Sequence, residues 1–151
     1  MPSLVFPSLV RDEVLKQHVE LRGLLARAIV DAAPQPSAPS EMDAECLATT
    51  ARDLCARFRV HLAFEEDALA RVFAVLDAWG PERVRNLHDD HARQRKEFDA
   101  LLGMFEAGGD VEVLAVALRN LASDLLRDME EEEDRLGAGL MSDDSLSVER
   151  R

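Results

Sequence analysis

The chain has 151 residues, of which 47% are hydrophobic and 32% are charged, and its formal net charge is −12 at pH 7. This apolar content is enough to form one buried core, and the length favours a single domain. The negative charge repels the phosphates of nucleic acids and the headgroups of anionic lipids. We therefore expect no nucleic acid and no membrane as partners, and we find no run of about 20 apolar residues that could span a bilayer.

The composition is typical of helices. The chain has no Tyr, a single Trp and 7 Gly, and it is rich in Ala, Leu, Glu and Arg,. Its N-terminus lacks the basic and long apolar stretches of a signal peptide. Cys46 and Cys55 form no CxxC pair, and nine residues on one helix set them on opposite faces, so we expect two small buried thiols in a reducing compartment,. The sequence thus favours an all-α, cytoplasmic protein.

The first expected helix begins near Ser8, directly after Pro7, and stops at the proline-containing segment 34–39,. The second is unusually long, because its apolar pattern continues from a cap at Ser40 to about Ala78,. Gly80 and Pro81 then interrupt the chain. In the first helix, the apolar residues expected to face the core are Leu9, Leu15, Val19, Leu21, Leu25 and Ile29.

Two further helices are expected from Pro81 to Ala107 and from Val111 to about Leu136, separated by a Gly-Gly-Asp turn,. The short connections favour antiparallel neighbours, which predicts an up-down-up-down antiparallel four-helix bundle. We divide the chain into an N-terminal arm (1–7), a helical domain (8–137) and a polar tail (138–151) that we expect to be flexible,.

The two halves of the chain align with each other. Matching His18 to His91 also matches Arg22 to Arg95, and the matched pairs of the other two helices are His61 with Asp128, Glu65 with Glu132, and Glu66 with Glu133. We interpret this as a duplicated helical hairpin in which each half serves one metal ion. Arg22 and Arg95 are expected either to neutralise nearby carboxylates or to extend into solvent.

A set of potential metal ligands recurs on all four helices. Residues four apart lie on one helix face, so the pairs in the second and fourth helices can aim at one interior point. Imidazole and carboxylate donors without thiolate suit iron or manganese, and the same donors are also compatible with zinc. The alternative is that these polar groups face solvent or pair with Arg. The candidate ligands are His18, His61, Glu65, His91, Asp128 and Glu132.

Other residues are weaker candidates. His88 lies three residues before His91 and shares its face, which suggests a supporting or surface role. Within the acidic run 130–134 only Glu132 is nominated, and the rest is expected to be a solvated face. No His has Glu three residues before it, which disfavours the Glu-x-x-His pattern of ferritin-like di-iron bundles,.

The segments QHVELRGLL, HLAFEE, DDHARQR and DMEEEEDRL resemble those of the hemerythrin-like domain, also called the HHE cation-binding domain, over about residues 8–137. The family pattern carries over onto His18, His61, Glu65, His91 and Glu132. Asp128 stands where the family usually has a histidine. Aspartate can still ligate an ion, although its reach is shorter, and extra carboxylate donation should lower the reduction potential.

The resemblance implies two iron ions joined by a carboxylate and an oxo or hydroxo bridge, with an open position for dioxygen, peroxide or nitric oxide. Three functions follow as expectations: a protein that binds, senses or buffers oxygen, iron or nitric oxide; a peroxidase-like or oxygen-reducing di-iron enzyme; or a degenerate or zinc-filled bundle that acts as an interaction module. The apolar residues expected to limit water access to the ions are Val19, Leu62, Phe64 and Leu125. The sequence indicates no particular protein partner.

Overall fold

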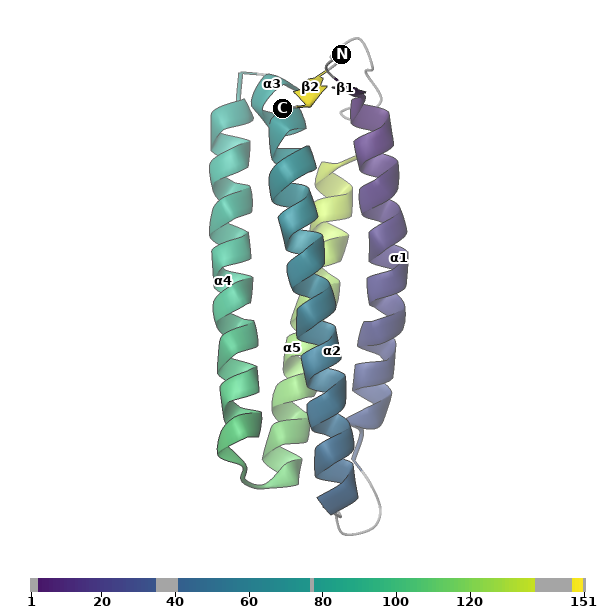
Figure 1. Cartoon of the computed structure of the whole chain (residues 1–151), viewed down its shortest axis with the longest axis vertical. Helices are drawn as coiled ribbons and strands as arrows, with labels where there is room; N and C mark the ends of the chain where they lie inside the picture. The colour runs from purple at the N-terminus through teal and green to yellow at the C-terminus, as the bar shows by residue number, and fades with distance from the viewer. Residues whose placement is uncertain (1–2, 35–40, 77, 138–147, 151) are drawn as a thin grey trace.

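The computed structural model describes residues 3–34, 41–76, 78–137 and 148–150. It contains the long helices α1 (Pro7–Asp31), α2 (Glu41–Phe64), α4 (Gly80–Ala107) and α5 (Val111–Arg135), and α2 continues through a π-helical turn into the short α3 (Ala70–Leu76). Neighbouring long helices run antiparallel. α1 packs against α2 and α5, and α4 packs against α2, α3 and α5 (Figure 1). The predicted all-α up-down-up-down bundle is confirmed.

The ends of the helices follow from local chemistry. Pro7 occupies the first turn of α1, where a missing backbone N–H costs nothing,. Between α4 and α5, Gly108 and Gly109 adopt φ angles of 75° and 130° that other residues rarely reach,. Asp110 then caps α5 by accepting a hydrogen bond from the backbone N–H of Glu112 at 2.9 Å,. These features place the reversal between α4 and α5 where the sequence predicts it.

The second helix departs from the prediction in its interior. A single α-helix was expected up to about Ala78, but residues Glu65–Leu69 form a π-helical turn in which the Ala70 N–H donates to the Glu65 carbonyl oxygen. The helix ends at Leu76, and the predicted start at Ser40 lies outside the described residues. A π turn inserts one residue without disturbing the apolar spacing enough to be recognised in sequence, and such turns often occur at functional sites.

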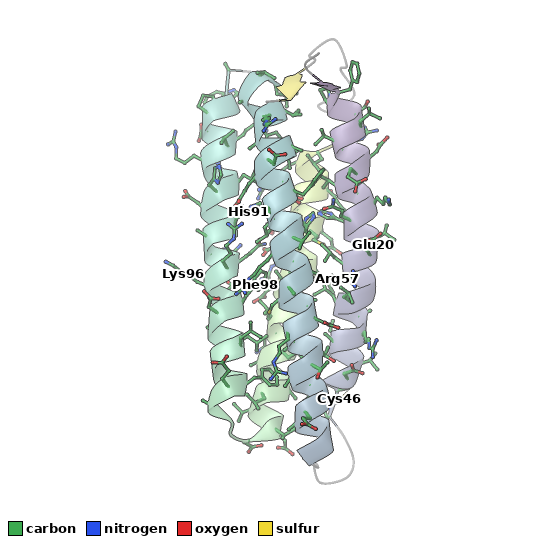
Figure 2. The ribbon with its side chains drawn as sticks, viewed as in Figure 1. Glu20, Cys46, Arg57, His91, Lys96 and Phe98 are labelled. Atoms are coloured by element: carbon green, nitrogen blue, oxygen red, sulfur yellow. The ribbon has the colours of Figure 1, made fainter. Side chains whose placement is uncertain are left out.

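The core consists of two apolar clusters, one at each end of the bundle. The cluster near the start of α1 includes Val10, Val14, Leu69, Phe73, Leu87 and Leu136. The other lies towards the end of α1 and includes Leu25, Leu54, Phe58, Phe98, Leu118 and Leu125. Figure 2 shows Phe98 on the inner side of α4 and Lys96 pointing outwards. The clusters are separated by a layer of polar residues.

The predicted core face of α1 is partly wrong. Leu9 and Val19 are 60% and 69% exposed, while Val10 and Val14 are buried. The buried stripe of this helix passes through His18, which is fully buried. Because only apolar residues were counted, the predicted buried face is displaced by one residue at Leu9 and at Val19. Val19 is therefore not positioned to limit the access of water to the ions.

The two cysteines differ. Cys55 is buried as expected, and burial raises the pKa of its thiol to about 11,. Cys46 is exposed, contrary to the expectation of two buried thiols. No helix among the described residues is both long and apolar enough to cross a membrane.

A short antiparallel pair of strands lies beside the start of α1 (Figure 1). β1 (Ser3–Val5) pairs with β2 (Val148–Arg150), with Leu4 opposite Glu149. Three residues of the segment expected to be a flexible tail are therefore paired with the N-terminal arm, whereas residues 138–147 of that segment lie outside the described residues.

Gly80 is required by a close backbone approach at the junction of α3 and α4. A Cβ atom there would lie 2.5 Å from the carbonyl oxygen of Phe73 and 2.7 Å from that of Ala74. We expect Gly80→Ala to lower the free energy of unfolding by about 1–3 kcal/mol, because backbone atoms cannot move aside cheaply. Urea unfolding of the metal-free chain measures this effect.

The matched control is Gly23→Ala in the interior of α1, where a new Cβ meets nothing within 4 Å. This change should raise the free energy of unfolding by about 0.5–1 kcal/mol, because alanine is the better helix former. Equal effects of the two substitutions would show that the contact at Gly80 does not constrain the fold.

Candidate metal centre

The polar layer between the two apolar clusters contains the predicted ligands. His18, His61, Glu65 and His91 are each at most 5% exposed and come from α1, α2, the π turn and α4. Figure 2 shows His91 on the inner side of α4. These residues surround a cavity of about 20 Å³, together with Glu132 of α5. Apolar residues above and below each of them fix the height of the layer in the bundle.

Four of the predicted ligands form a compact group. His18, His61, Glu65 and Glu132 each offer one ligand atom, and these atoms all lie within 4.8 Å of one another. Nε2 of His18 is 3.1 Å from Oε1 of Glu132 and 3.6 Å from Oε1 of Glu65. Nε2 of His61 contacts the same Glu65 oxygen. A set of two imidazoles and two carboxylates of this size could hold one cation.

The second oxygen of Glu65 faces the other side of the cavity. Its Oε2 atom is 3.0 Å from Nε2 of His91. The Glu65 carboxylate therefore touches three imidazoles, two through one oxygen and one through the other. Such a carboxylate can bridge two neighbouring cations.

Outer carboxylates hold two of the histidines. Nδ1 of His18 donates to Oε1 of Glu133 at 3.0 Å, and Arg22 donates to both oxygens of the same carboxylate at 2.7 and 2.6 Å. Because a carboxylate paired with arginine is ionised, it can only accept, so Nδ1 carries the proton and Nε2 faces the cavity.

The same arrangement recurs in the other half of the site. Nδ1 of His91 donates to Oε1 of Glu66 at 3.0 Å, and Arg95 donates to the two oxygens of Glu66 at 2.6 and 2.9 Å. The internal alignment matched these residues to those around His18, but Glu133 was assigned to a solvated face and Glu66 was not nominated. Glu66 and Glu133 each follow directly after a candidate ligand, and the internal alignment pairs them with each other. This correspondence was the signal that could have identified them.

His61 is oriented by an amide rather than by a carboxylate. Its Nδ1 donates to Oε1 of Gln17 at 2.7 Å, and Nε2 of Gln17 donates to Glu13 at 3.1 Å. Neither Gln17 nor Glu13 was predicted, because each stands alone outside the repeated pattern. This contact again turns Nε2 towards the cavity.

The electrostatics show how tightly the layer is coupled. Burial opposes charge on Glu65, but its contacts with His18, His61 and His91 hold the pKa of its carboxyl well below the usual value,. Burial and the nearby Glu65 charge raise the pKa of Glu132 to about 7. Burial lowers the pKa of His18, but Glu132, Glu65 and Glu133 together raise it to about 10. The site favours positive charge next to its carboxylates.

Asp128 lines the cavity but is not part of the compact group. Its Oδ2 atom accepts hydrogen bonds from Nε2 of Gln94 at 3.1 Å and from Arg93 at 3.3 Å. Gln94, which the sequence reasoning missed, is 7% exposed and also lines the cavity. The side chain of His88 is 53% exposed, and its Nδ1 is 3.9 Å from Oε1 of Glu66, at the edge of the outer carboxylate.

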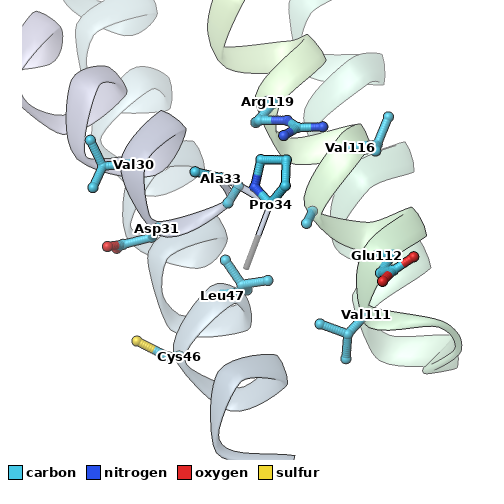
Figure 3. A pocket seen from close by; sticks show the side chains of 12 residues that line it. Val30, Asp31, Ala33, Pro34, Cys46, Leu47, Val111, Glu112, Val116 and Arg119 are labelled. Carbon is cyan, nitrogen blue, oxygen red and sulfur yellow. The ribbon is translucent and has the colours of Figure 1, made fainter. Parts of the chain in front are cut away.

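A larger pocket of about 490 Å³ lies between the end of α1 and the first turns of α2 and α5 (Figure 3). Its charged lining residues are Asp31, Glu112 and Arg119, and no histidine is among the described residues that line it. Cys46 contributes a thiol. This pocket therefore offers much less for metal binding than the central cavity.

Comparison with known families agrees with this geometry. The family model described as the hemerythrin HHE cation-binding domain matches residues 9–138, which is most of the chain. Searches of curated proteins and of solved structures give no match. The matched region includes every member of the His and Glu cluster. The chain therefore belongs to the hemerythrin family of HHE cation-binding domains.

Proposed function

We propose that this protein is a non-haem di-iron protein that binds dioxygen or nitric oxide between its helices. The observation that carries the proposal is the position of the Glu65 carboxylate, whose Oε1 faces His18 and His61 and whose Oε2 faces His91. A buried carboxylate whose two oxygens face imidazoles on different sides could bind one cation through each oxygen. The cytoplasmic location expected from the sequence stays a prediction.

The donor set fits iron. His18, His61, Glu65 and Glu132 would hold one ion, while His91 and the second oxygen of Glu65 would begin the coordination of the other. Nε2 of His18 and Oε1 of Glu65 and Glu132 are buried and lack hydrogen-bond partners among the described residues. Buried polar atoms without partners are costly, and a bound cation would satisfy all three. Manganese and zinc accept similar donors.

The protein limits what can reach the ions. The cavity has a volume of about 20 Å³ and is partly lined by Phe58, Leu62 and Met129. This is close to the space that a single water occupies, so the inner cavity has no room for an organic substrate between the donor atoms,. Bound iron supplies a redox-active centre with affinity for dioxygen, peroxide and nitric oxide. The inner cavity therefore favours a small ligand such as dioxygen, peroxide or nitric oxide.

Metal content tests the proposal directly. Protein loaded anaerobically with Fe²⁺ and dialysed without chelator should contain about two irons per chain by elemental analysis. Iron at 100 times its dissociation constant should stabilise the fold by about 2.7 kcal/mol, which raises Tm by about 5–10 °C relative to chelated protein. Addition of nitric oxide to the loaded protein should change its visible absorption spectrum.

Glu65→Leu should abolish most iron uptake, because it removes the carboxylate shared by three histidines. Glu20→Leu, which makes the same change in charge at an exposed position of α1, should leave uptake unchanged. Absence of iron, or a single zinc per chain, would contradict the proposal and favour an interaction module. Rapid turnover of hydrogen peroxide by the loaded protein would instead identify a peroxidase-like enzyme.

The outer carboxylates provide a second prediction. Glu133→Ala and Glu66→Ala should each weaken metal binding by about 10- to 100-fold, because His18 or His91 loses the acceptor that aims its Nε2 at the cavity,. Competition of Fe²⁺ with a chromophoric chelator measures both affinities.

Glu130→Ala is the matched control, since this exposed residue lies in the same acidic run and its loss changes the net charge equally. If Glu130→Ala weakened binding as strongly as Glu133→Ala, general attraction of cations by the acidic chain would explain the effect, and the orienting role of Glu133 would be refuted.

A further inference from the structure

The two halves of the metal centre have the same outer partners for their histidines, but they differ in other residues of the buried helix faces. His18 and His91 have equivalent Glu and Arg partners. One turn further along the two helices, however, the alignment that matches His18 to His91 also matches the buried Leu21 to Gln94. The second half therefore has an amide where the first half has an apolar side chain. It also has Asp128 where the first half has His61.

Gln94 is buried at the site, and its amide nitrogen is bound to Asp128. The residue lies one turn after His91 on α4 and lines the same cavity. Its Nε2 donates to Oδ2 of Asp128 at 3.1 Å. The reverse orientation of the amide would place two oxygens against each other, so the Asp128 carboxylate holds the amide nitrogen and leaves Oε1 of Gln94 available,.

The Gln94 oxygen shares a property with three of the other candidate ligand atoms. Its Oε1 is buried without a hydrogen-bond partner among the described residues, as are Nε2 of His18 and Oε1 of both Glu65 and Glu132. Asp128 differs, because its Oδ2 already accepts from Arg93 and Gln94. Ligation through Oδ2 of Asp128 would have to break these contacts, whereas Gln94 would keep its bond to Asp128 while using its free oxygen.

We propose that Oε1 of Gln94 is a ligand of the second cation, beside His91 and Oε2 of Glu65, and that Asp128 positions this amide. The inference rests on the two-ion centre proposed above. The first position has two imidazoles, while the second has one imidazole and neutral and anionic oxygens. The second position should therefore bind iron more weakly and favour harder cations such as Mn²⁺.

The surroundings of Gln94 also make the second position the more accessible one. A groove of about 320 Å³ lies between α4 and α5 and shares His91, Gln94, Asp128 and Glu132 with the inner cavity. His18 and His61 do not line this groove. The second cation thus lies beneath the groove and should exchange faster than the first.

Stepwise titration tests the assignment. Metal-free protein is titrated anaerobically with Fe²⁺ in competition with a chromophoric chelator, and with Co²⁺, whose visible absorption reports its ligands. The unaltered chain should bind two ions in two resolved steps. Gln94→Leu, which reproduces Leu21 of the other half, should leave the first step unchanged and weaken the second by about 10- to 100-fold.

Gln94→Met serves as a second variant of similar length if the leucine variant does not fold, and it should also lose the second step for Fe²⁺. Asp128→Asn keeps an acceptor for the Gln94 amide and should weaken the second step less than Gln94→Leu does. The second-step Co²⁺ spectrum should change in Gln94→Leu, a readout that a purely structural role would not move.

The outcomes separate the two proposals. If the unaltered chain binds no iron, the proposed function is overturned. If it binds two ions and Gln94→Leu binds the second as tightly, with the same Co²⁺ spectrum, only the role of Gln94 is overturned. If Asp128→Asn abolishes the second step while Gln94→Leu retains it, Asp128 is the ligand and the assignment is reversed.

Discussion

The rest of the structure depends on the burial of the Glu65 carboxylate at the centre of the bundle. An ionised group removed from water is tolerated only with compensating charge, and three imidazoles meet it there,. The polar layer also divides the core into two apolar clusters, so each helix must bring its polar residues to the same height. Packing on both sides therefore holds the donor atoms in place, as a metal site requires.

The outer contacts show that neither hairpin could build this centre alone. His18 belongs to the first hairpin but is held by Glu133 of the second, and His91 of the second is held by Glu66 of the first. The compact group likewise takes three members from the first hairpin and Glu132 from the second. The expectation that each half serves one ion is therefore too simple. The two equivalent contacts instead connect a helix of one hairpin to an adjacent antiparallel helix of the other hairpin.

The sequence was sufficient to predict the helices and to place the candidate ligands on faces that meet inside the bundle, because helical spacing determines which side chains share a face,. It was insufficient where orientation depends on partners distant in the chain. Glu133 was expected on a solvated face and Glu66 was not nominated, whereas Arg22 and Arg95 hold these two carboxylates against histidines. The π turn at Glu65 leaves no periodic signal. Gln94 lies three residues after His91 on α4, but a single amide did not mark it as a candidate ligand. The buried His18 displaced the predicted core face of α1.

Asp128 and Glu132 line the same cavity but differ in the partners of their carboxylate oxygens. Oε1 of Glu132 is buried beside His18 and has no hydrogen-bond partner among the described residues, so a cation would gain an unused donor. Asp128 has a shorter side chain, and its Oδ2 is already bound by an arginine and an amide. Its charge is therefore compensated before any metal arrives. Among the residues that line the central cavity, the buried atoms without hydrogen-bond partners therefore indicate where a cation would be stabilised,.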